Sequence, residues 1–341
     1  KMKMIFEKLW EELKIESAKL EAGTIKRMLG SESTCPMLLG IKVPELTKIF
    51  ILEVPKGVAP LSENIPESKG FNFDVRIIGD EINSDNVSLI LSSSNIDYNE
   101  LFSSISEDLF SQLNGLENTR EVVSTFLNRV RLWQTFCEIQ NPEGLGEDAQ
   151  KGLYGELFFL DSYVLTGNSG YEPKINTWLG PRNRQHDFQF GNMVVEVKTT
   201  SMKQHQKLQI ASEQQLDETL VDRLYLFYLS VSLIENNDDT LPALVSKIRR
   251  KLHQEIVALA VFDNALIERG YLDAHESKYS RTGYSIRDSR FFLVTDDFPR
   301  IKEEELRNGV GDVKYSILVA ECSDYEIPEN DFVKELEENF Q

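Results

Sequence analysis

Residues 186–198, HDFQFGNMVVEVK, restrict the fold of this chain more than any other segment of its sequence. The Gly-Asn pair at 191–192 is a good two-residue hairpin turn, because glycine readily adopts the positive φ that such turns require. Counting outward from this turn pairs Phe190 with Met193, Gln189 with Val194, Phe188 with Val195, and Asp187 with Glu196. Directly opposed residues share a face, with Cβ atoms about 4.5–5.5 Å apart. The segment therefore predicts two neighbouring carboxylates on a β-hairpin.

The strand after the turn carries charged residues inside an apolar run, MVVEVK. A Glu-x-Lys pattern occurs five times in the chain, so the apolar run is what distinguishes this copy. Alternation along the strand places Glu196 and Lys198 on one face, together with Val194. Two opposed carboxylates repel each other unless a divalent cation lies between them. An ammonium group on the same face can orient or deprotonate a metal-bound water, so the pattern predicts a catalytic metal site.

Two other interpretations of these residues remain open. The acid pair and Lys198 also fit a solvent-exposed salt bridge across an edge hairpin, which contributes little to stability. The adjacent His186 and Asp187 also match part of an HD-type phosphohydrolase, a class that needs further His and Asp ligands on helices. The remaining histidines have no such partners in the sequence: His205, His253 and His275.

The spacing of cysteines and histidines narrows the kind of metal site. Cys35, Cys137 and Cys322 are far apart and form no CxxC pair, which supports neither a zinc site nor a disulfide framework. The four histidines show no HExxH or HxH spacing. We therefore expect a metal held by oxygen, with Mg²⁺ as the cofactor and Mn²⁺ as a substitute.

The formal net charge of −19 counts against a nucleic-acid partner, because contacts to phosphate need Lys and Arg. The charge is unevenly spread, however. Residues 171–215 contain six basic and four acidic residues, and residues 245–290 contain nine and six, so these two stretches are net basic. The candidates for nucleic-acid contact are Lys203, Lys207, Arg249, Arg250 and Lys251. The last three also fit a solvated helix face.

Changes in hydrophobic period divide the chain into three regions. Residues 1–97 have an opening helix and then strand-like runs, which indicates an N-terminal α+β region. Residues 98–147 have a helical pattern and are predicted to form a connector. Residues 148–341 predict a mixed α/β domain with a helix, the hairpin, a central strand over 224–234, one helix over 241–270, and late strands at 290–295 and 315–321.

The sequence gives no sign of a membrane segment. No run approaches the roughly 20 consecutive apolar residues that a membrane-spanning helix needs. Residues 1–14, KMKMIFEKLWEELK, read as a charged amphipathic helix rather than as a signal peptide. We therefore expect a cytoplasmic protein with no membrane partner.

Four segments together resemble one known family. GLYGELFFL, WLGPRNRQHDFQF, VVEVKTTS and IASEQQLDE, in this order and spacing, are similar to the bacterial proteins named PD-(D/E)XK motif proteins, members of the PD-(D/E)XK nuclease superfamily. Genes for these proteins typically lie in restriction-modification and phage-defence clusters. One departure is that His186 stands where the proline that gives the motif its name would be.

The resemblance implies a restriction-endonuclease-like mixed β-sheet core flanked by helices. It also implies that Asp187 and Glu196 bind Mg²⁺, that Lys198 assists the attacking water, and that Glu156 is the acid carried by the preceding helix. For Glu156 an exposed helix position remains the alternative.

The implied function is that of a Mg²⁺-dependent DNA endonuclease in a restriction or anti-phage defence system. DNA would be the substrate, with RNA open as an alternative, and other defence subunits or a second copy of the chain would be partners. The rival interpretation is a non-catalytic DNA-binding or scaffolding subunit that keeps the nuclease fold.

Overall fold

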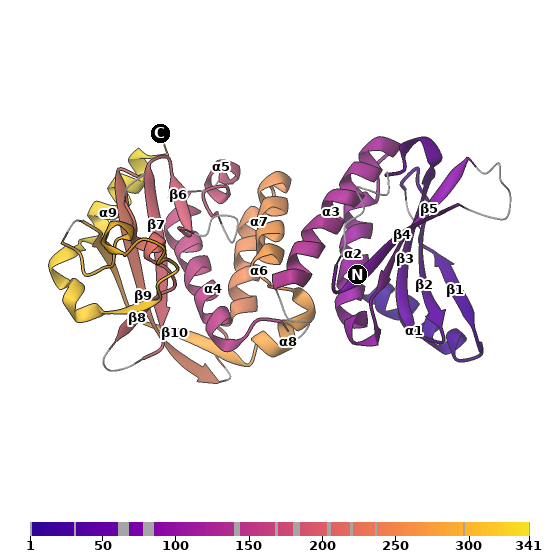
Figure 1. The fold of residues 1–341 in the computed structure, drawn as a ribbon, viewed down its shortest axis with the longest axis horizontal. Helices are drawn as coiled ribbons and strands as arrows, with labels where there is room; N and C mark the ends of the chain where they lie inside the picture. Colours follow the sequence, from indigo (N-terminus) through magenta and orange to yellow (C-terminus); the bar gives the residue numbers. More distant parts are fainter. Residues whose placement is uncertain are drawn as a thin grey trace. The chain divides into compact units, whose positions relative to one another are not determined.

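The computed structural model describes residues 2–30, 32–60, 68–77, 85–139, 144–167, 170–179, 185–202, 206–218, 221–235, 237–295 and 297–340. The chain divides into two compact units, residues 1–144 and 145–341, which are described separately (Figure 1). The expected class, mixed α/β, is confirmed. No helix in the described part of the chain is long and apolar enough to cross a membrane.

The first unit is built on an antiparallel sheet with the strand order β1-β2-β3-β5-β4. Its strands are β1 (Gly23–Met28), β2 (Met37–Val43), β3 (Thr47–Pro55), β4 (Phe71–Ile77) and β5 (Asn86–Ser93). Its helices are α1 (Met2–Ser17), α2 (Asn99–Leu113) and α3 (Thr119–Ile139). The sequence suggested a helical connector over residues 98–147. Both α2 and α3 pack against β3, so we assign them to the first unit.

The second unit contains a mixed sheet with the strand order β12-β10-β9-β7-β6. These strands are β6 (Phe188–Phe190), β7 (Met193–Thr200), β9 (Arg223–Glu235), β10 (Thr282–Leu293) and β12 (Glu326–Ile327). β7 and β9 run parallel, whereas the other neighbouring pairs are antiparallel. The strand expected at 224–234 lies at the centre of the sheet, between β7 and β10.

Alternation along β7 separates two hydrophobic cores. On one face, Val195 and Val197 join a core built with α4 (Glu147–Phe159), α6 (Leu241–Leu252), α7 (Ile256–Glu268) and α9 (Glu329–Glu338). On the other face, Val194 joins a core that includes the small sheet of β8 (Lys207–Ile210) and β11 (Tyr315–Leu318). The expected division of faces along this strand is therefore confirmed. The short helices α5 (Tyr171–Ile175) and α8 (Glu276–Tyr279) complete the unit.

Three expected elements have different bounds in the structure. The single helix expected over 241–270 is wrong, because α6 and α7 are separate helices. Between them Glu255 has a φ of −109° and a ψ of 85°, and its carboxylate accepts a hydrogen bond of 2.8 Å from the backbone N–H of Tyr171. The strand expected from 290 begins earlier, at Thr282, and the strand expected over 315–321 ends at Leu318, where a 3₁₀ helix follows.

Candidate active site

The hairpin has the register that its turn predicts. Phe190 pairs with Met193, Gln189 with Val194, and Phe188 with Val195. Gly191 has a φ of +60°, the left-handed conformation that favours glycine. Asp187 lies directly before β6, and its carboxylate accepts a hydrogen bond of 2.9 Å from the backbone N–H of Val197. This bond fixes one carboxylate beside the strand that carries the next two charged residues.

Glu196 and Lys198 lie together on β7. Lys198 Nζ is 2.6 Å from Glu196 Oε1, and the Glu196 side chain is only 2% exposed. The hairpin is at the edge of the sheet, but its strand β7 lies between β6 and β9 and the pair is largely buried, so it is not a solvent-exposed salt bridge. Lys198 also donates a hydrogen bond of 2.9 Å to Gln215 Oε1, which in turn accepts one of 2.8 Å from the backbone N–H of Ala211. Gln215 therefore holds the lysine in place.

Glu156 reaches the same region from α4. It is buried, which excludes the exposed helix position that the sequence left open. Its Oε2 accepts a hydrogen bond of 2.9 Å from Trp178 Nε1. Gly155 explains how the helix can lie so close to β7, because a Cβ atom at this position would collide with the Thr199 hydroxyl.

Arg269, at the C-terminal end of α7, completes the cluster. Its Nη2 lies 2.6 Å from Glu156 Oε2 and 3.2 Å from Asp187 Oδ1. Its guanidinium also lies over the Trp178 ring, 5.8 Å from the centroid. Sequence analysis missed this residue. The signal was weak, since Arg269 is one of nine basic residues between 245 and 290 and matches no motif.

Burial dominates the electrostatics of these groups. It raises the pKa of Glu156 to about 8, although Arg269 opposes the shift. Burial and the charge of Asp187 raise the pKa of Glu196 to about 8 as well, against the opposing charge of Lys198. Burial alone would lower the pKa of Lys198, but the surrounding carboxylates outweigh it and raise this pKa above its ordinary value. Lys198 therefore stays protonated in this arrangement.

The donor set fits a divalent cation. Across the described ranges, no three His, Cys, Asp or Glu side chains are already arranged as metal ligands. Mg²⁺, however, is usually bound through one or two carboxylates, with water and substrate phosphate completing its shell. Asp187 and Glu196 supply such a pair, and Glu156 interacts electrostatically with both. The HD-type interpretation gains no support, because His186 is buried and the described residues bring no further His and Asp ligands to it.

The predicted nucleic-acid contacts fall into three groups. Lys203 lies outside the described residues. Lys207 on β8 and Arg250 on α6 are exposed. Arg249 is held by Asp263 and Asp273 at 2.8 and 2.9 Å, and Lys251 is held by Asp161 at 2.5 Å. Contact of any of them with DNA stays a prediction.

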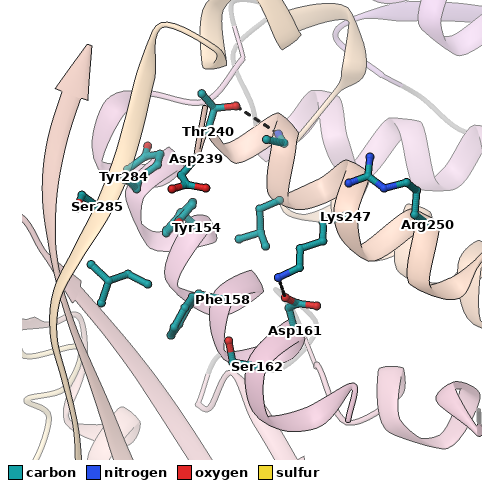
Figure 2. A pocket seen from close by; sticks show the side chains of 13 residues that line it. Tyr154, Phe158, Asp161, Ser162, Asp239, Thr240, Lys247, Arg250, Tyr284 and Ser285 are labelled. Carbon is teal, nitrogen blue, oxygen red and sulfur yellow. Dashed lines mark hydrogen bonds and ion pairs between the residues drawn. The ribbon is translucent and has the colours of Figure 1, made fainter. Parts of the chain in front are cut away.

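A separate cavity of about 390 Å³ lies among α4, α6 and β10 (Figure 2). Tyr154 and Phe158 of α4 line it, and Lys247 points to Asp161, with 2.7 Å between Nζ and Oδ2. None of the carboxylates of the candidate site lines this cavity. Lys247 belongs to the basic stretch on α6, and its pairing shows that part of this stretch neutralises a buried acid.

A mixed sheet flanked by helices, with two acids and a lysine on and beside one hairpin and a third acid on the preceding helix, defines a PD-(D/E)XK-type core. The comparison with family models agrees. The model described as "Putative PD-(D/E)XK family member, (DUF4420)" matches residues 6–320. The chain belongs to this family, and the resemblance seen in the sequence is confirmed. Neither the curated proteins nor the solved structures contain a match.

Proposed function

We propose that this protein is a metal-dependent DNA endonuclease that acts in a bacterial restriction or anti-phage defence system. The observation that supports a nuclease is the convergence of Glu156, Asp187, Glu196 and Lys198 in one largely buried cluster. Membership of a PD-(D/E)XK family supports the same class of reaction. The role in defence rests on the resemblance of the sequence motifs alone.

In this proposal Asp187 and Glu196 hold Mg²⁺, and Mn²⁺ substitutes for it. The cation would stabilise negative charge that develops on the phosphoryl oxygens during hydrolysis. Glu196 lies on an internal strand, and the carboxylate of Asp187, which directly precedes β6, is bound to the backbone N–H of Val197 on β7. A site held by regular structure keeps its geometry better than one built on loops.

Lys198 acts as a hydrogen-bond donor rather than as a base. In the absence of metal, the neighbouring carboxylates raise the pKa of Lys198 and favour the charged ammonium, which has no lone pair with which to accept a proton. Contacts with Glu196 and Gln215 fix its position. It can therefore orient the attacking water or bind a phosphate oxygen of the substrate.

The test is cleavage of phage and plasmid DNA with Mg²⁺, Mn²⁺ or EDTA. Glu196→Gln should lower cleavage by at least about a hundredfold, since it removes a ligand charge without changing the size of the side chain. Glu276→Gln is the matched control, because Glu276 belongs to another Glu-x-Lys pattern and is exposed on α8. Cleavage should need metal, survive in the control and be lost in Glu196→Gln.

One observation favours the rival function, a non-catalytic scaffold with a nuclease fold. Arg269 and Lys198 already pair with all three carboxylates of the site, which a relic core could retain for stability alone. Calorimetric titration with Mn²⁺ separates the two functions. Absence of metal binding, together with no cleavage of DNA or RNA by the wild type, would favour the scaffold.

A further inference from the structure

Arg269 has a position that structural packing alone does not require. A single nitrogen, Nη2, contacts Glu156 and Asp187, which come from two different elements. The side chain is 18% exposed, and its Nε has no hydrogen-bond partner within the described part of the chain. A partly buried guanidinium with an unused donor is costly unless its charge is needed, so we take the carboxylates to be the reason for its position.

We propose that Arg269 is the resident counter-ion of the carboxylate cluster: it offsets the charges of Glu156 and Asp187 in the absence of metal and restricts the site to one divalent cation. This inference rests on the proposed metal-dependent function and names a positioning residue for it.

The charge balance of the cluster supports a single cation. When all groups are ionised, three carboxylates face Arg269 and Lys198, which leaves a net charge of −1. One divalent cation changes this to +1, and one bridging phosphodiester then brings the site to neutrality. A second divalent cation would leave an excess charge of +2 in a buried region, where like charges repel strongly.

The two carboxylates keep neutral partners when the arginine is removed. Glu156 retains its hydrogen bond from Trp178 Nε1, and Asp187 retains the one from the backbone N–H of Val197. Loss of Arg269 should therefore change the charge of the site more than its shape. Removing a positive charge next to a cation site strengthens binding, so the neutral variant should bind metal more tightly, not more weakly.

The experiment is isothermal titration of the full chain with Mn²⁺ at pH 8, in the absence of nucleic acid. Wild type should bind one ion per chain. Arg269→Gln should bind Mn²⁺ about tenfold more tightly, whereas Arg269→Lys, which keeps the charge, should stay within about threefold of wild type. Two ions per wild-type chain, or weaker or unchanged binding in Arg269→Gln, would overturn the inference.

A second measurement covers the case in which Arg269→Gln does not fold. The double variant Glu156→Gln/Arg269→Gln removes one charge of each sign and keeps the net charge of the cluster. Its melting temperature in EDTA should exceed that of Arg269→Gln, or the double variant alone should fold. Equal melting temperatures would contradict a counter-ion role. If the wild type binds no metal, the proposed function itself is rejected. If the wild type binds one ion and the Arg269 variants bind Mn²⁺ with the same affinity, only the role of Arg269 is rejected.

Discussion

The fold buries the carboxyl groups of Glu156 and Glu196 and thereby favours their neutral, protonated form. Their pKa values rise from the ordinary 4.5 to about 8, mainly because burial disfavours the charged state. A raised pKa means that the folded state binds the proton more tightly than the unfolded state. The stability from this source is fully present below pH 4.5 and is lost as pH rises through about 8. We expect the melting temperature in EDTA to fall over this window.

The control for this pH dependence is Glu196→Gln, which removes one of the two titrating groups. Its melting temperature should fall less steeply than that of wild type between pH 5 and pH 8, measured by calorimetry in EDTA. Parallel curves for the two proteins would show that Glu196 does not titrate in this window.

The residues of the site differ in how far the sequence could predict them. Asp187, Glu196 and Lys198 follow from local geometry, because a two-residue turn fixes the register of a hairpin. Glu156 depends on the family resemblance, since α4 is too uniformly apolar for its face to be assigned. Arg269 could not be predicted, because it lies at the end of a helix more than 70 residues beyond the hairpin and only tertiary packing brings it there.

At the scale of elements, the contact between α4 and β7 sets the position of Glu156. Gly155 faces Thr199 without room for a Cβ atom, whereas Gly152, one turn earlier on the same helix, faces open space. Gly155→Ala should therefore lower the free energy of unfolding by about 1–3 kcal/mol, because overpacking outweighs the better helix propensity of alanine. Urea denaturation measures the difference.

Gly152→Ala is the matched control, and it should gain up to about 1 kcal/mol from helix propensity. Adding Thr199→Ala to Gly155→Ala removes the hydroxyl that the new methyl group meets, so it should recover most of the loss. Equal effects of the two glycine substitutions would mean that the close approach of α4 to β7 is not what requires Gly155.

The long central strand β9 and the hairpin were predictable because each has a strong local pattern. The break between α6 and α7 was not, since His253, Gln254 and Glu255 at the break are residues that a helix can also carry. The contact that Glu255 makes there is with the distant backbone N–H of Tyr171. The same holds for the extra length of β10, which forms because β9 offers it a partner along almost its whole length. Pairing partners far apart in the chain extend strands beyond what their own residues indicate.

At the scale of the whole molecule, a net charge of −19 opposes a polyanionic substrate. The two net basic stretches of the sequence do not translate directly into free cations, because Arg249, Lys247 and Lys251 pair with acids of the second unit. Lys207 and Arg250 are the exposed candidates that remain among the described residues named here. We therefore propose that partner subunits or a second copy of the chain supply part of any DNA-binding surface.

For the isolated chain we expect weak DNA binding that falls steeply with salt. Lys207→Ala and Arg250→Ala should each weaken binding by a few-fold and reduce the slope of log K against log salt by about one, as loss of a phosphate contact does. Arg249→Ala should instead lower the melting temperature, because it removes the guanidinium that Asp263 and Asp273 both contact. Fluorescence anisotropy in EDTA, where no cleavage occurs, measures the affinities. Tight binding that does not respond to salt would mean that the isolated chain carries a complete DNA-binding surface.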